Sequence, residues 1–453
     1  ADVDTLVADV LRMMFRFGVF EREDGPYGEM PFEQHRPLAL RAAREGVVLL
    51  KNSGQALPLE EIDSLAVIGD RAFRATTGGG GSSAVHAWLE PDAPVQSIRQ
   101  RFGAENVKVA RGVDELPGRV SIDEGAWTIA DGSRGVRAEY FDNPRLEGEP
   151  RLVRTEPRIA FDWDRFAPEP ALPVDRWSAR FTGRLAVPVD GAYELELVRS
   201  GAARVWLDGQ PLFTEESWKH GGLAHYSARV DLEADQEYEV RVEYFDINQR
   251  HALVKLGWSV PGRDLQQDLV SEAVTAAAGA SAALVFVGDP ASEGRDRPGL
   301  SLGDAANRLV SAVAAVSPRT VVVLSSGAPV SMPWIDEVEA VLLTWYAGQE
   351  GGAALVDLLD GSVSPSGRLP VTFGKTIGDY PANTPRRYPG IAPAGAPDET
   401  WREAVYEEGV FVGYRHFDRA DIEPLFAFGH GLSYTGFDWS EPRVEPRDDG
   451  EGW

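Results

Sequence analysis

Apolar and polar residues follow two different rhythms along the chain. Residues 1–24 and 36–50 repeat apolar side chains every three to four positions, which predicts two amphipathic helices. Short apolar runs, typical of strands buried on both faces of a sheet, occur at 65–68, 282–287, 320–324 and 340–343, and residues 107–109 (Val-Lys-Val) predict a further strand. Helical patterns separate most of these runs, at 95–102, 264–278, 305–316 and 351–359. Strands that alternate with helices predict a mostly parallel sheet.

Between residues 137 and 258 the period of the pattern falls to two. Residues 193–198 and 238–244 alternate apolar and polar side chains, and turn dipeptides recur between such stretches. This texture is typical of an antiparallel β-sandwich. The helix–strand rhythm resumes after Pro261 and Gly262. We therefore expect a β-sandwich inserted into one α/β domain, at a loop whose two ends lie close together.

Composition narrows the classes of partner. Asp and Glu number 71 against 45 Lys and Arg, and the formal net charge is -26. Such a chain is a poor match for nucleic acid or an anionic membrane, although a well-solvated surface explains the acidity equally. There is no Cys, which excludes disulfides and thiolate chemistry. No apolar run approaches the roughly 18 residues of a membrane span.

Glu293 is the candidate catalytic residue. It follows the apolar run 282–287 in a polar loop at the carboxyl end of a predicted strand, where open α/β sheets place their sites. A carboxylate on such a loop suits general acid/base catalysis, and a solvated loop glutamate fits the pattern equally well. A glycosidase would need a second carboxylate that faces it.

Nine segments carry a family resemblance: 44–52 (REGVVLLKN), 57–59 (LPL), 68–69 (IG), 293–297 (EGRDR), 326–334 (SGAPVSMPW), 345–352 (WYAGQEGG), 365–370 (PSGRLP), 406–415 (YEEGVFVGYR) and 428–434 (FGHGLSY). In order and spacing they resemble glycoside hydrolase family 3, the β-glucosidase-type enzymes. The resemblance implies an (α/β)6 sandwich that packs against an N-terminal (β/α)8 barrel, with Glu293 as the acid/base. The family's nucleophilic Asp lies in a Ser-Asp-Trp motif that this chain lacks. Residues 161–164 (Phe-Asp-Trp-Asp) are only superficially similar to that motif, because they fall in the β-sandwich pattern.

The inserted segment resembles a protective-antigen-type (PA-14-like) domain, through residues 140–141, 191–193, 204–209 and 242–245. Sugar-binding members hold calcium with an Asp-Asp pair, whereas Ser200 and Gly201 stand here, so we expect no metal and no cofactor. Many relatives place an aromatic residue over the leaving group where this chain has Ser82. We hypothesise that Trp218 or Phe245 of the insert takes that place, which makes Ser82, Trp218 and Phe245 the candidate substrate-binding residues.

The hydrophobic pattern and the family resemblance together predict how the chain is divided into segments. The segments are the end of an absent barrel (1–35), the first part of the (α/β)6 sandwich (36–134), the insert (135–262), the second part (263–437) and a linker toward a fibronectin type III-like domain (438–453). Because the chain starts inside a helical pattern, we interpret residue 1 as a cut in a longer bacterial, extracellular enzyme. Its missing leader is therefore uninformative.

The resemblance implies a retaining exo-β-glucosidase that removes terminal non-reducing β-D-glucose from oligosaccharides or from natural-product glucosides such as glucosylated macrolides. A β-xylosidase of the same family and a non-catalytic carbohydrate-binding or scaffold protein remain alternatives, and a homodimer is left open. We also expect an ion pair between Asp296 and Arg297, a structural hydrogen bond of His430 within its own turn, and a helix that starts at Glu350.

Overall fold

The structure is a computed structural model, and it describes residues 2–21, 31–60, 62–80, 83, 85, 91–164, 167–169, 171–213, 222–246, 251–289, 293, 296–297, 299–395, 401–438 and 440–443. The chain divides into two compact units, Ala1–Pro37 and Leu38–Trp453. The first unit holds α1 (Asp2–Arg16), whose apolar residues Leu6, Val7 and Val10 are exposed. The helix α2 (Phe32–Gly46) begins in the first unit and ends in the second.

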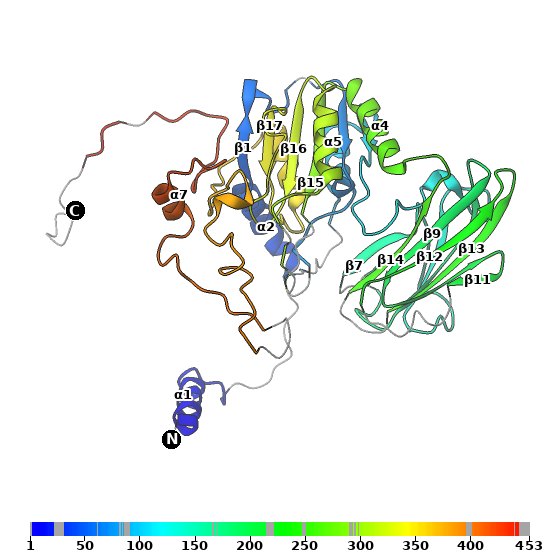
Figure 1. Ribbon diagram of the computed structural model, residues 1–453, viewed down its shortest axis with the longest axis horizontal. Coiled ribbons are helices and arrows are strands. Elements are labelled where there is room, and N and C mark those ends of the chain that lie inside the picture. The colour runs from blue at the N-terminus through cyan, green and yellow to red at the C-terminus, as the bar shows by residue number, and fades with distance from the viewer. Residues whose placement is uncertain are drawn as a thin grey trace. The chain divides into compact units, whose positions relative to one another are not determined.

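A six-stranded sheet forms the centre of the α/β part of the second unit (Figure 1). Its strands, in spatial order, are β1 (Val48–Asn52), β17 (Ala340–Leu343), β16 (Thr320–Ser325), β15 (Ala282–Gly288), β2 (Leu65–Ile68) and β3 (Val107–Ala110). Five of them pair in parallel, and β1 runs antiparallel to β17 at the edge. The continuous apolar runs are buried throughout β2, β15, β16 and β17, which confirms the parallel sheet.

Helices cover both faces of this sheet. The helices α4 (Leu265–Ala278) and α5 (Asp304–Ala314) bury Ala273 and Leu309 against one face (Figure 1). The helices α3 (Pro94–Phe102) and α6 (Gly351–Leu359) bury Ile98 and Leu358 against the other. Glu350 is the residue directly before α6, so the predicted helix start is confirmed. The three layers are those expected of an α/β sandwich.

One predicted helix is wrong over its last four residues. The pattern favoured a helix over residues 36–50, but α2 ends at Gly46 and β1 begins at Val48. The reason is that positions 47 to 50 are all apolar and all buried. A helix at the sheet edge would bury one stripe of them. Here Val48 and Leu50 of β1 pack on one face of the sheet, and Leu49 with the preceding Val47 packs on the other.

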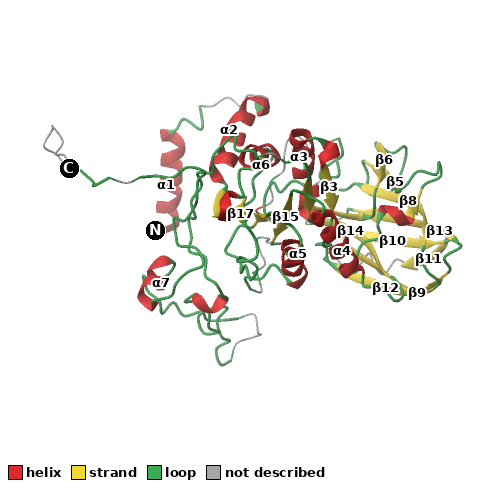
Figure 2. Ribbon diagram, turned by 90° about the horizontal axis from the view of Figure 1, so that it is seen from above, coloured by secondary structure: helices red, strands yellow, loops and turns green. Residues whose placement is uncertain are grey.

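The inserted segment folds as two facing antiparallel sheets (Figure 2). The larger has the order β11-β10-β13-β8-β5-β6, with β4 also paired to β8, and the smaller has the order β12-β9-β14-β7. Their bounds are β4 (Trp127–Thr128), β5 (Val136–Phe141), β6 (Leu152–Glu156), β7 (Ala160–Asp164), β8 (Ser178–Ala186), β9 (Gly191–Ser200), β10 (Ala202–Leu207), β11 (Gln210–Phe213), β12 (Ala224–Leu232), β13 (Glu237–Phe245) and β14 (Ala252–Ser259). Because β4 pairs with β8, the sandwich includes Trp127 and begins before residue 135, where the sequence pattern placed its start.

The remaining described elements are short. They are η1 (Ser53–Gln55), η2 (Asp70–Phe73), η4 (Ala104–Asn106), η5 (Glu124–Ala126), η7 (Ile377–Asp379) and α7 (Tyr414–Ala420). His430 Nε2 lies 2.8 Å from the carbonyl oxygen of Leu50. Its role is structural as expected, but its partner is the distant strand β1 and not its own turn. In the part of the chain that the structure describes, every helix is too short or too polar to cross a membrane.

Candidate active site

Three strand ends meet at the carboxyl edge of the sheet. The strand β15 ends at Gly288 and leads into Asp289, while β16 ends at Ser325 and leads into Ser326. The chain beyond β17 brings Tyr346 to the same place. Because these strands are parallel, the residues that follow them lie together, as in other open α/β sheets.

Asp289 is the centre of this cluster and is 3% exposed. Ser326 Oγ donates a hydrogen bond to its Oδ2 over 3.0 Å, and the Tyr346 hydroxyl donates to Oδ1 over 3.2 Å. Arg297 Nη1 forms an ion pair with Oδ2 at 3.2 Å. Arg71 Nη2 donates to the main-chain carbonyl oxygen over 2.9 Å. Both the side chain and the backbone of Asp289 are therefore held, as a buried carboxylate requires.

The local backbone makes room for these contacts. A Cβ atom on Gly288 would lie 2.7 Å from Arg71 Nε and 2.2 Å from the Ser325 carbonyl oxygen, so only glycine fits there. Trp345 has a φ of 55°, in the left-handed region that a large residue rarely adopts. This unusual backbone directly precedes Tyr346. Burial and the neighbouring Asp289 raise the pKa of Tyr346, which keeps its hydroxyl a hydrogen-bond donor.

Glu293 is exposed and lies between Asp289 and Arg297 in the chain. Its main-chain N–H donates to the carbonyl oxygen of Gly80 over 3.0 Å, which places Gly80 beside it. Arg297 also donates to the carbonyl oxygen of Pro329 over 3.0 Å. The segment that carries Glu293 thus starts and ends at residues fixed to the sheet.

The other predicted site residues have separate outcomes. Ser82 and Trp218 lie outside the described residues. Phe245 is buried at the end of β13, with the Arg204 guanidinium 5.6 Å from its ring. Its role as a substrate-binding residue stays a prediction. Among the described residues, no group of three or more His, Asp or Glu side chains is placed to hold a metal ion.

The predicted ion pair between Asp296 and Arg297 is wrong. Arg297 pairs with Asp289, and Asp296 makes a hydrogen bond with Tyr388 that raises the pKa of that tyrosine. The buried carboxylate of Asp289 needs a cationic partner within the fold, whereas Asp296 is exposed to water. The partner of Arg297 instead comes from the strand end that begins the same loop.

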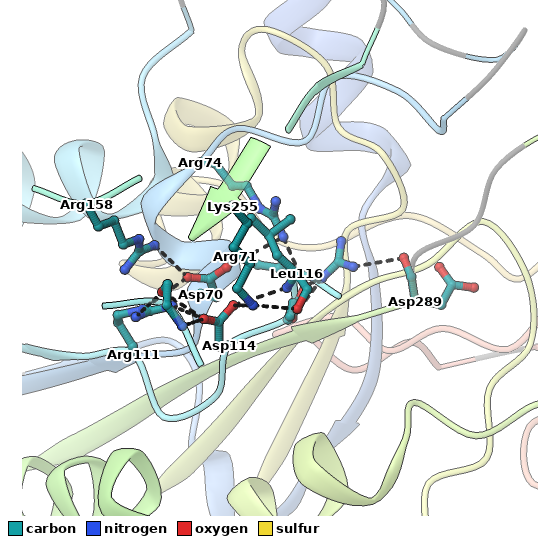
Figure 3. A network of polar contacts seen from close by, with 11 residues as sticks. Asp70, Arg71, Arg74, Arg111, Asp114, Leu116, Arg158, Lys255 and Asp289 are labelled. Atoms are coloured by element: carbon teal, nitrogen blue, oxygen red, sulfur yellow. Dashed lines mark hydrogen bonds and ion pairs between the residues drawn. The ribbon is translucent and has the colours of Figure 1, made fainter. Parts of the chain in front are cut away.

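A second cluster of charges, the junction cluster, lies where the sandwich meets the α/β part (Figure 3). It consists of Asp70 after β2, Arg111 and Asp114 after β3, Arg158 before β7 and Lys255 in β14. Lys255 Nζ lies 3.2 Å from Asp114 Oδ1, and the two side chains are 0% and 1% exposed. Arg111 contacts Asp114 at 3.2 Å and Asp70 at 3.4 Å. Arg158 reaches Asp70 at 3.1 Å.

The partners of the junction cluster shift its titration. Burial alone would raise the pKa of Asp114, but Lys255, Arg111 and hydrogen bonds from Ser121 outweigh it and hold that pKa far below its usual range. Burial lowers the pKa of Lys255, against the attraction of Asp114. The charged partners outweigh burial at Asp114 but not at Lys255, because Asp114 lies beside two cations whereas Lys255 has one close carboxylate.

Arg71 links the two clusters. Its Nε lies 2.9 Å from Glu115 Oε2, directly after Asp114, and its Nη2 holds the Asp289 carbonyl (Figure 3). These charged partners were not predicted from the sequence. The signals that could have found them are Lys255 within the apolar run of β14 and Asp289 at the end of the fully buried strand β15. A charge in such a place needs a partner.

Residues 47–414 match the family described as the glycosyl hydrolase family 3 C-terminal domain. The three-layer α/β sandwich, with an exposed carboxylate beyond its central strand β15, is therefore the C-terminal domain of this class of glycosidase. The chain belongs to glycosyl hydrolase family 3, as the sequence motifs indicated.

Relatives and solved structures extend this finding. The chain is 35% identical over 458 residues to a β-glucosidase of Rhizobium radiobacter, which covers 96% of this chain and 53% of the relative. It is similar, at 31% identity and a TM-score of 0.64, to the structure of DesR, a β-glucosidase from Streptomyces venezuelae in complex with D-glucose, over 97% of this chain and 50% of that one. A Kluyveromyces marxianus β-glucosidase in complex with glucose gives 26% identity and a TM-score of 0.67, over 98% and 54%. The chain therefore spans about half the length of the relatives it matches.

Proposed function

We propose that this chain is the C-terminal part of a retaining exo-β-glucosidase and that Glu293 is its acid/base. The observation that carries the proposal is the exposed Glu293 at the carboxyl edge of the family 3 sheet. The similarity to β-glucosidases over nearly the whole chain supports the same activity.

In the proposed reaction Glu293 acts twice. It first protonates the glycosidic oxygen of the leaving group while a second carboxylate attacks the sugar. It then removes a proton from the water that hydrolyses the glycosyl-enzyme ester. Retaining enzymes hold the two carboxyl groups about 5–5.5 Å apart. We propose that the second carboxylate belongs to a separate barrel segment, which the doubled length of the relatives supports.

The proposed substrate has a terminal β-D-glucose. The two relatives whose structures contain glucose support this sugar, and neither decides the leaving group. We further propose that the sandwich is a PA-14-like insert that shapes the leaving-group side of the site, with Trp218 as the candidate contact. Its attachment through the junction cluster supports a fixed position for the insert.

The test is Glu293→Ala in the full-length enzyme. Turnover of an alkyl β-glucoside should fall about 10²–10⁴-fold, because its leaving group needs a proton. Added azide should restore turnover of a dinitrophenyl β-glucoside, which needs no acid to leave. Glu423→Ala, at another exposed glutamate, is the matched control and should behave as wild type. Normal turnover of the alkyl glucoside by Glu293→Ala would overturn the proposal.

A further inference from the structure

We infer that Asp289 and Arg297 are positioning residues for Glu293, since their ion pair closes the base of the loop that carries it. The inference rests on the proposed function of Glu293. It assigns a purpose to two charged groups that neither donate nor accept a proton in that reaction.

The contacts place the pair at the two ends of one short loop. Asp289 directly follows β15, and its side chain is 2% exposed. Arg297 lies four residues beyond Glu293, its side chain is 21% exposed, and its Nη1 is 3.2 Å from Asp289 Oδ2. The same Nη1 donates to the Pro329 carbonyl oxygen, in the loop after β16. The far end of the Glu293 loop is thus tied to two neighbouring strands.

Asp289 is fixed well enough to serve as an anchor. Ser326 and Tyr346 occupy both of its carboxylate oxygens, and Arg71 holds its main-chain carbonyl. Desolvating this carboxylate is unfavourable, and apolar residues would fill a sheet edge at a smaller cost. A buried carboxylate with three directional contacts, on a backbone held by a fourth, is instead suited to setting the orientation of a neighbouring segment.

Positioning matters more for Glu293 than for an ordinary surface residue. A general acid must come within about 2.6–3.2 Å of the oxygen that it protonates. A displacement near 1 Å can reduce the rate about 10²-fold. Weakening the pair should therefore impair proton donation selectively and leave sugar binding largely intact.

The experiment compares two substrates in the full-length enzyme. Asp289→Asn and Arg297→Gln should each lower kcat/KM for an alkyl β-glucoside by about 10–10²-fold, mainly through kcat. For a dinitrophenyl β-glucoside, whose departure needs no acid, kcat/KM should change less than about 3-fold. The double variant should lose no more than the worse single variant, because both changes break one contact. Arg297→Lys keeps the charge and should recover part of the loss.

The matched control is Asp357→Asn, which breaks the ion pair of Asp357 with Arg44 on another side of the domain. It should leave the ratio of the two substrates unchanged. Equal losses on both substrates, or an unchanged ratio in every variant of the pair, would overturn the positioning role. If Asp289→Asn fails to fold, Arg297→Gln, which removes the charge of the other partner, decides by the same ratio. The proposed function fails separately, if wild type hydrolyses no β-glucoside or if Glu293→Ala keeps its alkyl glucoside turnover.

Discussion

Two buried aspartates, Asp114 and Asp289, are surrounded by cations in similar ways but in different settings. Asp114 pairs with Lys255 across the boundary between the α/β part and the sandwich, and both side chains are at most 1% exposed. Asp289 pairs with Arg297 within one loop, and the arginine is 21% exposed. The first pair joins the α/β part to the inserted sandwich, while the second holds one segment next to a proposed catalytic residue. The same chemistry should therefore support stability in one place and activity in the other.

The comparison depends on what is left when one partner is lost. Without Asp114, the ammonium group of Lys255 would stay buried beside Arg111 with only the Leu116 carbonyl to accept its hydrogen bond. Without Arg297, which is itself 21% exposed, Asp289 would keep Ser326 and Tyr346 as hydrogen-bond donors. Unfolding should thus respond mainly to the first change and turnover mainly to the second.

The largest effect on stability is expected for Asp114→Ala. Removing one partner of a buried ion pair leaves an uncompensated charge, and the free energy of unfolding should fall by about 3–5 kcal/mol. Urea denaturation followed by tryptophan fluorescence measures this change. Lys255→Met in the same background removes the stranded charge and should restore much of the loss. An Asp114→Ala variant with the midpoint of wild type would show that the junction cluster contributes nothing.

The next largest effect is expected in the pH dependence of stability, to which Asp114 should contribute. The folded pKa of Asp114 lies below its unfolded value, so its contribution is present above about pH 4 and is lost as the pH falls towards the folded pKa. Asp114→Asn should therefore flatten the decline in the free energy of unfolding between pH 4 and pH 2, by at most about 1.4 kcal/mol per pH unit. Urea midpoints at pH 5, 4 and 3 test this. Parallel curves for the variant and wild type would contradict it.

The fold could be predicted from the sequence more fully than the site. Continuous apolar runs placed β15 within one residue, and alternation placed the sandwich, because burial on one face or two leaves a period in the chain. The two-residue strand β4 is too short to leave a period. Partners such as Arg71 and Asp289 are 218 residues apart, and only the folded topology brings them together. The motif around Glu293 is visible in the sequence, whereas the pairing of Arg297 with Asp289 depends on the fold.

The smallest effect on stability is expected for the ion pair of Arg44 with Asp357, which neither joins the sandwich to the α/β part nor holds the segment of Glu293. Arg44 Nε donates to Asp357 Oδ2 over 2.7 Å, and the two side chains are 32% and 20% exposed. Solvent screens such a pair, so Asp357→Asn should change the free energy of unfolding by no more than about 1 kcal/mol. Denaturation alongside Asp114→Ala makes the comparison direct. A loss as large as that of Asp114→Ala would mean that burial does not distinguish these pairs, and the contrast between Asp114 and Asp289 would then need another cause.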